Sequence, residues 1–205
     1  MGGSRSNNGR KKQERLGPDD WAEEALRALA SGGLKALSVQ GLARRLGVTK
    51  GSFYWHFKSR DQLLDSALKL WERRGSVQRF AQLDLLEEPR DRLRRLFAST
   101  LEDEATLALD FAIQVAADDP RIAPWAKRVN RRWVAWLTGV YWELGLEVEE
   151  AHLWALLCYS NYVGFLRIIR TEGELVSKGT GRATWRRFVT DQLIPEVDAD
   201  AVPRT

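Results

Sequence analysis

Apolar residues recur every three or four positions along most of the chain, a spacing that predicts amphipathic α-helices. Glycine and proline mark the boundaries, so we expect a first helix over residues 18–32 and a fourth, linking helix over residues 59–73. No alternation of apolar and polar residues is long enough to predict a strand. The fold is therefore predicted to be all-α. Further helices are expected at about residues 89–101, 104–117, 121–144, 149–171 and 182–194.

Residues 38–57 contain two short predicted helices separated by a glycine. Ser38 is a good N-cap for the first helix, because its hydroxyl can accept a bond from an unpaired backbone N–H. Gly47 can adopt the left-handed conformation that ends this helix, and Thr49 can begin the second. Two helices joined by a short turn that contains glycine are typical of the helix-turn-helix, which binds DNA.

The same segment is locally basic. Residues 35–60 carry six lysines and arginines and no carboxylate, whereas the whole chain has a net charge of only +4. A charge run alone usually marks a solvated helix face. Because this one coincides with the predicted helix-turn-helix, we interpret it as a surface for nucleic-acid phosphates.

These residues also resemble a known family. The pattern S-V-x-x-L-A-x-x-L-G-V begins at Ser38, and K-G-S-F-Y-x-H-F-K-S-x-x-x-L-L begins at Lys50. Both lie within residues 21–68 and are similar to motifs of the tetracycline-repressor (TetR) family of bacterial transcriptional regulators. Gln40-Gly41 and Arg60-Asp61 depart from the usual pattern, and these differences bear on which operator is read.

The resemblance implies two folded domains after a basic arm. Residues 18–65 are expected to form a three-helix, helix-turn-helix DNA-binding head, and residues 66–205 a helical domain for effector binding and dimerisation. Residues 1–17 have a net charge of +4 and a composition that predicts disorder without DNA. This arm is either an inert tail or a contact to phosphate or a minor groove.

The resemblance also places the DNA-binding positions. They are Ser38, Gln40, Thr49, Lys50, Ser52, Tyr54, Trp55, His56, Lys58 and Arg60. Tyr54 and Trp55 can alternatively pack on the first helix.

Nine tryptophans are many for 205 residues, and most follow residue 70. A tryptophan at helical spacing is usually part of the core. Together with a few polar side chains, however, these aromatic residues can line an apolar cavity for a small guest molecule, and the family resemblance implies such an effector. The candidate ligand-binding residues are Phe97, Asp110, Phe111, Gln114, Trp125, Trp133, Trp136, Asn161 and Tyr162.

The last two predicted helices are apolar on more than one face, which indicates burial on several sides. Two such helices from each subunit making a four-helix interface is what the resemblance implies, and a C2 dimer is the commonest closed assembly. The predicted interface residues are Leu153, Leu157, Ser160, Gly164, Phe165, Ile168, Trp185, Phe188, Val189 and Gln192.

Several other function classes lack support in the sequence. No nucleophile elbow, metalloprotease, phosphate-loop or dinucleotide motif is present, so we expect no enzymatic activity and no cofactor. Cys158 cannot form an internal disulfide because it is the only cysteine, and the two histidines are too isolated to predict a metal site. Without a signal peptide or a membrane span, we expect a cytoplasmic protein.

The sequence thus predicts a sequence-specific DNA-binding regulator, most simply a repressor released by a small, mostly apolar or aromatic ligand. One alternative is a helical enzyme or ligand-binding protein whose basic segment is incidental. Another is an architectural DNA-binding protein that responds to no effector. A strong salt dependence of DNA binding would separate the first alternative from the regulator, and release by a ligand would separate the second.

Overall fold

The computed structural model describes residues 16–100, 102–175 and 180–197, and this part of the chain contains helices and no strands. The all-α prediction is confirmed. The predicted basic arm lies outside the described residues except for its last two positions. The elements are α1 (Pro18–Gly32), a 3₁₀ turn η1 (Gly33–Ala36), α2 (Val39–Arg45), α3 (Lys50–Tyr54), α4 (Arg60–Glu72), a π-helical segment η2 (Arg73–Gln78), α5 (Arg79–Leu83), α6 (Pro89–Thr100), α7 (Glu104–Val115), α8 (Ala123–Glu143), α9 (Val148–Thr171) and α10 (Thr180–Leu193).

Local capping explains the boundaries of the helices in the head, residues 18–65. The Ser38 hydroxyl accepts a 3.1 Å bond from the backbone N–H of Gly41, which begins α2. Gly47 has φ of 70°, the left-handed conformation that breaks the chain between α2 and α3. Ser59 begins α4 by accepting a 3.1 Å bond from the backbone N–H of Gln62.

The segment after α4 was not anticipated from the sequence. The chain does not stop at Arg73 but continues through the π-helical segment η2 into the short helix α5. Within η2, Ser76 is fully buried and its hydroxyl donates a 2.8 Å bond to the carbonyl of Glu72. A π-helical segment often accompanies a functional site, and this one lies between the head and the rest of the molecule.

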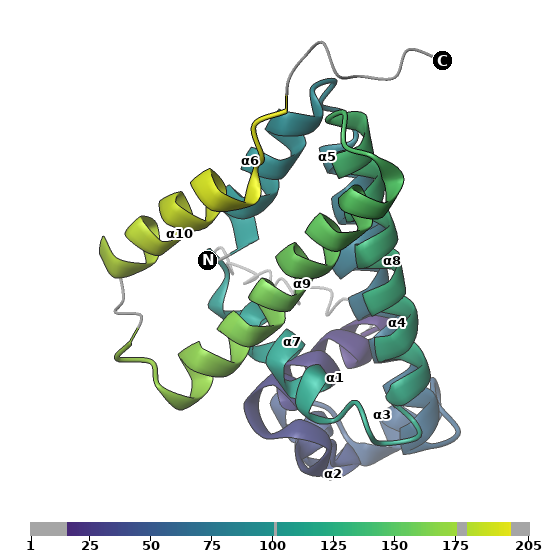
Figure 1. Cartoon of the computed structure of the whole chain (residues 1–205). Helices are drawn as coiled ribbons and strands as arrows, with labels where there is room; N and C mark the ends of the chain where they lie inside the picture. The colour runs from purple at the N-terminus through teal and green to yellow at the C-terminus, as the bar shows by residue number, and fades with distance from the viewer. Residues whose placement is uncertain (1–15, 101, 176–179, 198–205) are drawn as a thin grey trace, which may run out of the picture.

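Two hydrophobic clusters hold the described helices together. The first joins α1 to α4 and extends to Ile113 of α7 and Val129 of α8. The second joins α6, α8, α9 and the end of α10. In Figure 1 the head lies at one end of the molecule, against α7 and the first turns of α8.

Helix α4, which the sequence predicts as the linking helix, is not the only connection between the head and the rest of the molecule. Helix α1 also packs along α7, because their apolar faces share the first cluster. In addition, Arg121, just before α8, lies 3.3 Å from the carboxylate of Asp61 in α4.

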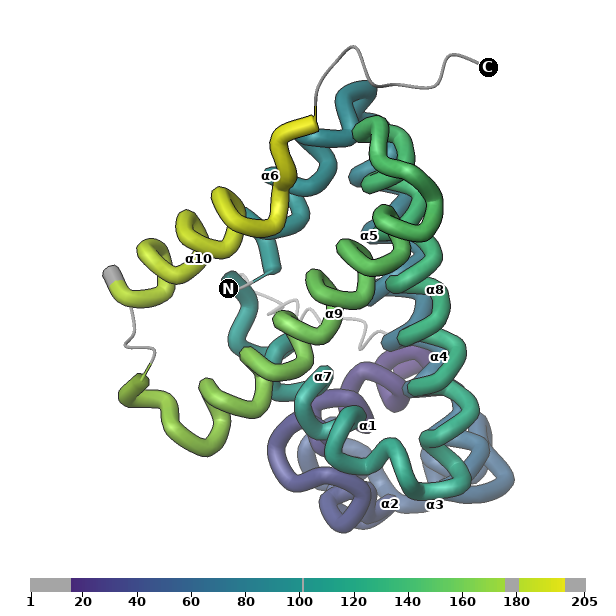
Figure 2. Tube along the Cα trace, in the orientation of Figure 1, coloured from purple at the N-terminus to yellow at the C-terminus, as the bar shows by residue number. Residues whose placement is uncertain are grey.

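Helices α8 and α9 form the main pair of the C-terminal part (Figures 1 and 2). Helix α10 packs instead on α6, and its end is fixed where the Tyr141 hydroxyl donates a 2.7 Å bond to the carbonyl of Leu193. Among the described helices, none is long and apolar enough to cross a membrane.

Candidate functional site

Helix α3 presents one buried face and one exposed face. Phe53 and Phe57 are buried and stack with ring centroids 5.5 Å apart, and Trp21 of α1 meets Phe53 edge-on at 5.4 Å. Trp55, between the two phenylalanines, is 87% exposed. It therefore does not pack on the first helix. Helix α3 is anchored in the core by its Phe53 and Phe57 face, and its opposite face is exposed.

The predicted DNA-binding residues all reach the surface of the head. Ser52 and His56 are half-buried, and the remaining eight are exposed. They extend from the start of α2 across α3 to the start of α4. The structure thus brings them onto one continuous part of the chain's surface, while their contacts with bases or backbone remain predictions.

One of the six cations in this segment is neutralised within the fold. Arg45 is paired with Glu24 of α1, which also accepts a 2.8 Å bond from Arg27. Burial opposes ionisation of Glu24, but the bonds from the two arginines lower its pKa. Among the described residues, no carboxylate lies within 4 Å of the other five cations, so their charge is available to phosphate: Lys35, Arg44, Lys50, Lys58 and Arg60.

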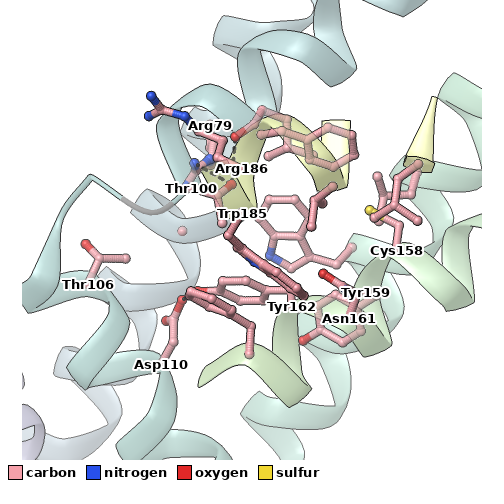
Figure 3. Close-up of a pocket in the computed structure, with 18 residues that line it drawn as sticks. Arg79, Thr100, Thr106, Asp110, Cys158, Tyr159, Asn161, Tyr162, Trp185 and Arg186 are labelled. Carbon is pink, nitrogen blue, oxygen red and sulfur yellow. Dashed lines mark hydrogen bonds between the residues drawn. The ribbon is translucent and has the colours of Figure 1, made fainter. Parts of the chain in front are cut away.

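A cavity of about 70 Å³ lies within the C-terminal part (Figure 3). Its walls come from the η2 and α5 segment and from α6, α7, α8, α9 and α10, and they are mainly apolar. Phe165 of α9 and Trp185 of α10 stack across it with ring centroids 5.6 Å apart. The thiol of Cys158 also lines the cavity, and burial raises the pKa of Cys158 to about 12, which supports an inert thiol.

Asp110 is the acidic group of this cavity, and both of its carboxylate oxygens are occupied. The indole N–H of Trp71 donates to Oδ1 at 2.7 Å, and the hydroxyl of Tyr162 donates to Oδ2 at 2.5 Å. Burial raises the pKa of Asp110, although these two bonds favour the charged form. Because Trp71 belongs to α4, the cavity is connected directly to the helix that carries the head.

Arg79, the first residue of α5, is a half-buried cation at the opposite end of the cavity from Asp110 (Figure 3). Its guanidinium donates to the hydroxyls of Ser99 at 2.9 Å and Thr100 at 3.4 Å, and lies 5.9 Å from the Trp133 ring centroid. No carboxylate of the described residues lies within 4 Å of it. Burial lowers the pKa of Arg79.

The structure brings together part of the predicted ligand-binding set. Phe97, Asp110, Trp133, Asn161 and Tyr162 line the cavity. Gln114 lines an adjoining hollow of about 20 Å³ instead. There its amide donates to Asn130 at 3.3 Å, the same oxygen that accepts a 2.7 Å bond from the hydroxyl of Tyr159.

The other three predicted ligand residues lie outside both hollows. Trp136 stacks on Phe80 at 4.8 Å and donates its indole N–H to Asp84. Trp125 lies under the guanidinium of Arg128, and Phe111 follows Asp110 by one position, which turns it about 100° around α7. Sequence reasoning also missed Arg79, because the helix that carries it was not recognised.

The predicted dimer residues divide into two groups. Leu153 and Leu157 are 64% and 53% exposed along α9, and Phe188 of α10 is 58% exposed. Ser160, Gly164, Ile168 and Gln192 are also exposed. Phe165, Trp185 and Val189 instead line the cavity of their own subunit.

The sequence of the head is similar to those of known regulatory proteins. Residues 23–67 fit the profile of the bacterial regulatory proteins of the tetR family. The HTH-type transcriptional repressor KstR2 of Mycolicibacterium smegmatis is 34% identical over 89 residues, which are 41% of this chain and 41% of KstR2. The HTH-type transcriptional regulator AcrR of Shigella flexneri is 31% identical over 83 residues, 40% of this chain and 39% of AcrR. The chain thus matches about two fifths of the length of these relatives.

Comparison with solved structures extends the likeness to the C-terminal helices. A transcriptional regulator from Saccharomonospora viridis, crystallised in complex with choline, has a TM-score of 0.71. The match covers 85% of this chain and 93% of that one, at 18% identity. At this identity the likeness concerns the fold alone.

Proposed function

We propose that this chain is a bacterial regulatory protein of the TetR family that represses transcription by binding operator DNA as a homodimer and is released by a small ligand. In this proposal residues 18–65 read the operator, and residues 66–205 hold the ligand and the partner subunit. The protein works in the cytoplasm, where it has access to the chromosome.

One observation carries the DNA-binding role. Helix α3 is anchored by the buried Phe53 and Phe57, and this leaves Thr49, Lys50 and Trp55 exposed beside cations without carboxylate partners. Side chains with these properties suit phosphate and base contacts in a major groove. A merely structural helix would not need an almost fully exposed tryptophan next to its core residues.

The cavity supports the ligand-responsive part of the proposal. It is mainly apolar and has a few polar groups that converge on it, as ligand sites do. A structure of the same fold was solved with choline, which supports ligand binding by this architecture and leaves the ligand of this chain open.

The bond between Trp71 and Asp110 supplies the route from ligand to head. A guest that displaces Tyr162 alters the partners of Asp110, and Asp110 holds the end of α4 through the Trp71 indole. A dimer reads half-sites about 34–36 Å apart, or a multiple of that distance. A small change in the direction of α4 would spoil this match without altering any reading residue.

The experiment is selection of genomic DNA fragments by the purified full-length protein, followed by titration on the selected site and on random DNA at several salt concentrations. A strong preference for the selected site and a steep fall in affinity with salt are expected. Equal affinity for selected and random DNA would contradict the proposal and favour an architectural protein. Release of the selected DNA by a compound that binds the C-terminal part would complete the test.

A further inference from the structure

Only three charged side chains line the described cavity, and they differ in the hydrogen-bond and ion-pair partners that each already has. Asp110 accepts from Trp71 and Tyr162, one bond to each oxygen. Arg186 donates to the carbonyl of Ala98 at 3.0 Å and lies 3.4 Å from the carboxylate of Glu102. Arg79 donates only to hydroxyl groups and lies beside an aromatic ring, while Asp110 and Tyr162 act on it from a longer distance and favour its charged form against burial.

A half-buried guanidinium with no carboxylate in direct contact is energetically unusual, because a buried charge is normally paired. The hydroxyls of Ser99 and Thr100 use only part of its five N–H donors. Both bonds come from Nη2, so the Nε–H and the two Nη1–H donors remain, and each can donate a single charge-assisted bond to a carboxylate. Arg79 is therefore the residue of this cavity with which an anionic group would form the most favourable ion pair.

Arg79 also stands at the entrance. Besides the inner cavity, it lines two larger hollows of about 290 Å³ and about 530 Å³ that open outward on the α1 side and the α6 side. The larger one is also lined by the cations Arg74 and Arg95 and by one acid, Asp103. An anionic group at Arg79 can thus remain near solvent while an attached apolar chain extends inward.

The inner cavity is narrow. Its volume of about 70 Å³ is roughly half of the ~150 Å³ that holds benzene in an engineered protein core. Its apolar lining includes Phe97, Trp133 and Trp185. An unbranched alkyl chain can place part of its length in this space and leave the rest in the outer hollows, whereas a fused-ring body is too wide to enter it.

We propose that the cavity binds a slender organic anion, namely a carboxylate with an unbranched alkyl chain, whose carboxylate pairs with Arg79 and whose chain lies among the aromatic walls. This deepens the proposed function and rests on it for the regulatory role. A cation of the same shape is disfavoured, since it would meet Arg79 at the entrance and find both oxygens of Asp110 occupied.

The test uses three compounds with the same ten-carbon chain and different charge: decanoate, decanol and decyltrimethylammonium, each below its micelle-forming concentration. Binding to the full-length protein is measured by calorimetry without DNA. A charge-assisted bond of the usual strength predicts that decanoate binds roughly ten- to a hundred-fold more tightly than decanol. Decyltrimethylammonium is expected to bind most weakly.

The variant Arg79→Gln should remove the preference for decanoate over decanol, and Arg79→Lys should retain part of it. Arg95→Gln is the matched control, because Arg95 is an exposed cation of the outer hollow that does not line the inner cavity. It should keep the preference within about two-fold, since exposed charges contribute little. Circular dichroism verifies that each variant is folded.

Equal or tighter binding of decanol or decyltrimethylammonium by the wild type would overturn the proposal, as would no binding of any of the three. Retention of the preference in Arg79→Gln would show that Arg79 is not the anion partner. Because these measurements contain no DNA, they can fail while selective operator binding succeeds. If operator binding fails while the preference for decanoate is intact, the regulatory role is refuted and the assignment of the cavity still holds.

Discussion

Phe53 and Trp55 are two positions apart in α3, yet the first is buried and the second is 87% exposed. The difference follows from helical geometry, since two positions correspond to about 200° around the axis. The spacing of Phe53 and Phe57 predicted this face correctly. The same reasoning failed for Phe111 and Trp136, because aromatic residues are equally suited to a core, a cavity wall or a surface stack.

If Lys50 and Gln40 contact bases, replacing either by alanine should cost about 1–3 kcal/mol on the selected site and relax the base preference there. Titration of selected and random DNA measures both effects. Arg94→Ala is the control, because Arg94 is an exposed arginine of α6, which lies far from the head in Figure 1. An equal loss on both DNAs would leave only phosphate contacts for the two residues.

Asp110 should make a contribution to stability that depends on pH. Because burial raises its pKa in the folded chain, the folded state holds this proton more tightly than the unfolded state. Its contribution therefore decreases as the pH rises from about 4 towards neutrality.

The variant Asp110→Asn removes that titration. The free energy of unfolding of the wild type minus that of the variant should fall with rising pH, by about 1.4 kcal/mol per unit of pKa shift. Chemical denaturation at a series of pH values measures the difference. A difference that rises with pH would mean that the bonds from Trp71 and Tyr162 outweigh burial.

At the scale of whole helices, most boundaries could be predicted because local chemistry sets them. Ser38, Gly47 and Ser59 stop or start helices through interactions with their immediate neighbours. The π-helical segment η2 could not be predicted, since burial of Ser76 and its bond with Arg132 of α8 depend on the tertiary fold. The cavity residue Arg79 was missed for the same reason.

The exposed apolar face of α9 predicts a dimer. Gly164→Trp should weaken it, because a side chain built at Gly164 meets no atom of its own subunit within 4 Å and would project into the partner. Sedimentation should show the wild type at twice 23.4 kDa and the variant shifted towards 23.4 kDa. Ala81→Trp, at an exposed position of α5, is the control and should stay dimeric. A monomeric wild type at micromolar concentration would refute the interface.

At the scale of the molecule, the head and the C-terminal helices share one hydrophobic cluster, so they pack directly against each other. Sequence reasoning correctly predicted an N-terminal helix-turn-helix head followed by further helices. It could not reveal that α1 packs on α7, because that contact joins residues far apart in the chain.

Trp71→Phe should separate ligand binding from DNA release. The substitution keeps an aromatic ring in the core but removes the indole N–H that Asp110 accepts. Binding of both ligand and DNA should persist, while the ligand's effect on DNA affinity should fall from the usual 5- to 150-fold towards one. Trp136→Phe is the control, since it removes an indole bond to Asp84 outside the cavity. Undiminished release by Trp71→Phe would exclude this route.

Helix α10 supplies Trp185 and Val189 to the cavity wall, although Leu193 is the only side chain described in that helix that is buried. A wall with so little buried surface opens at a low free-energy cost. In the proposed dimer, the partner subunit covers Phe188 and holds this wall closed. Subunit dissociation and ligand escape are then linked processes, so the residence time of a bound ligand should shorten as the protein is diluted.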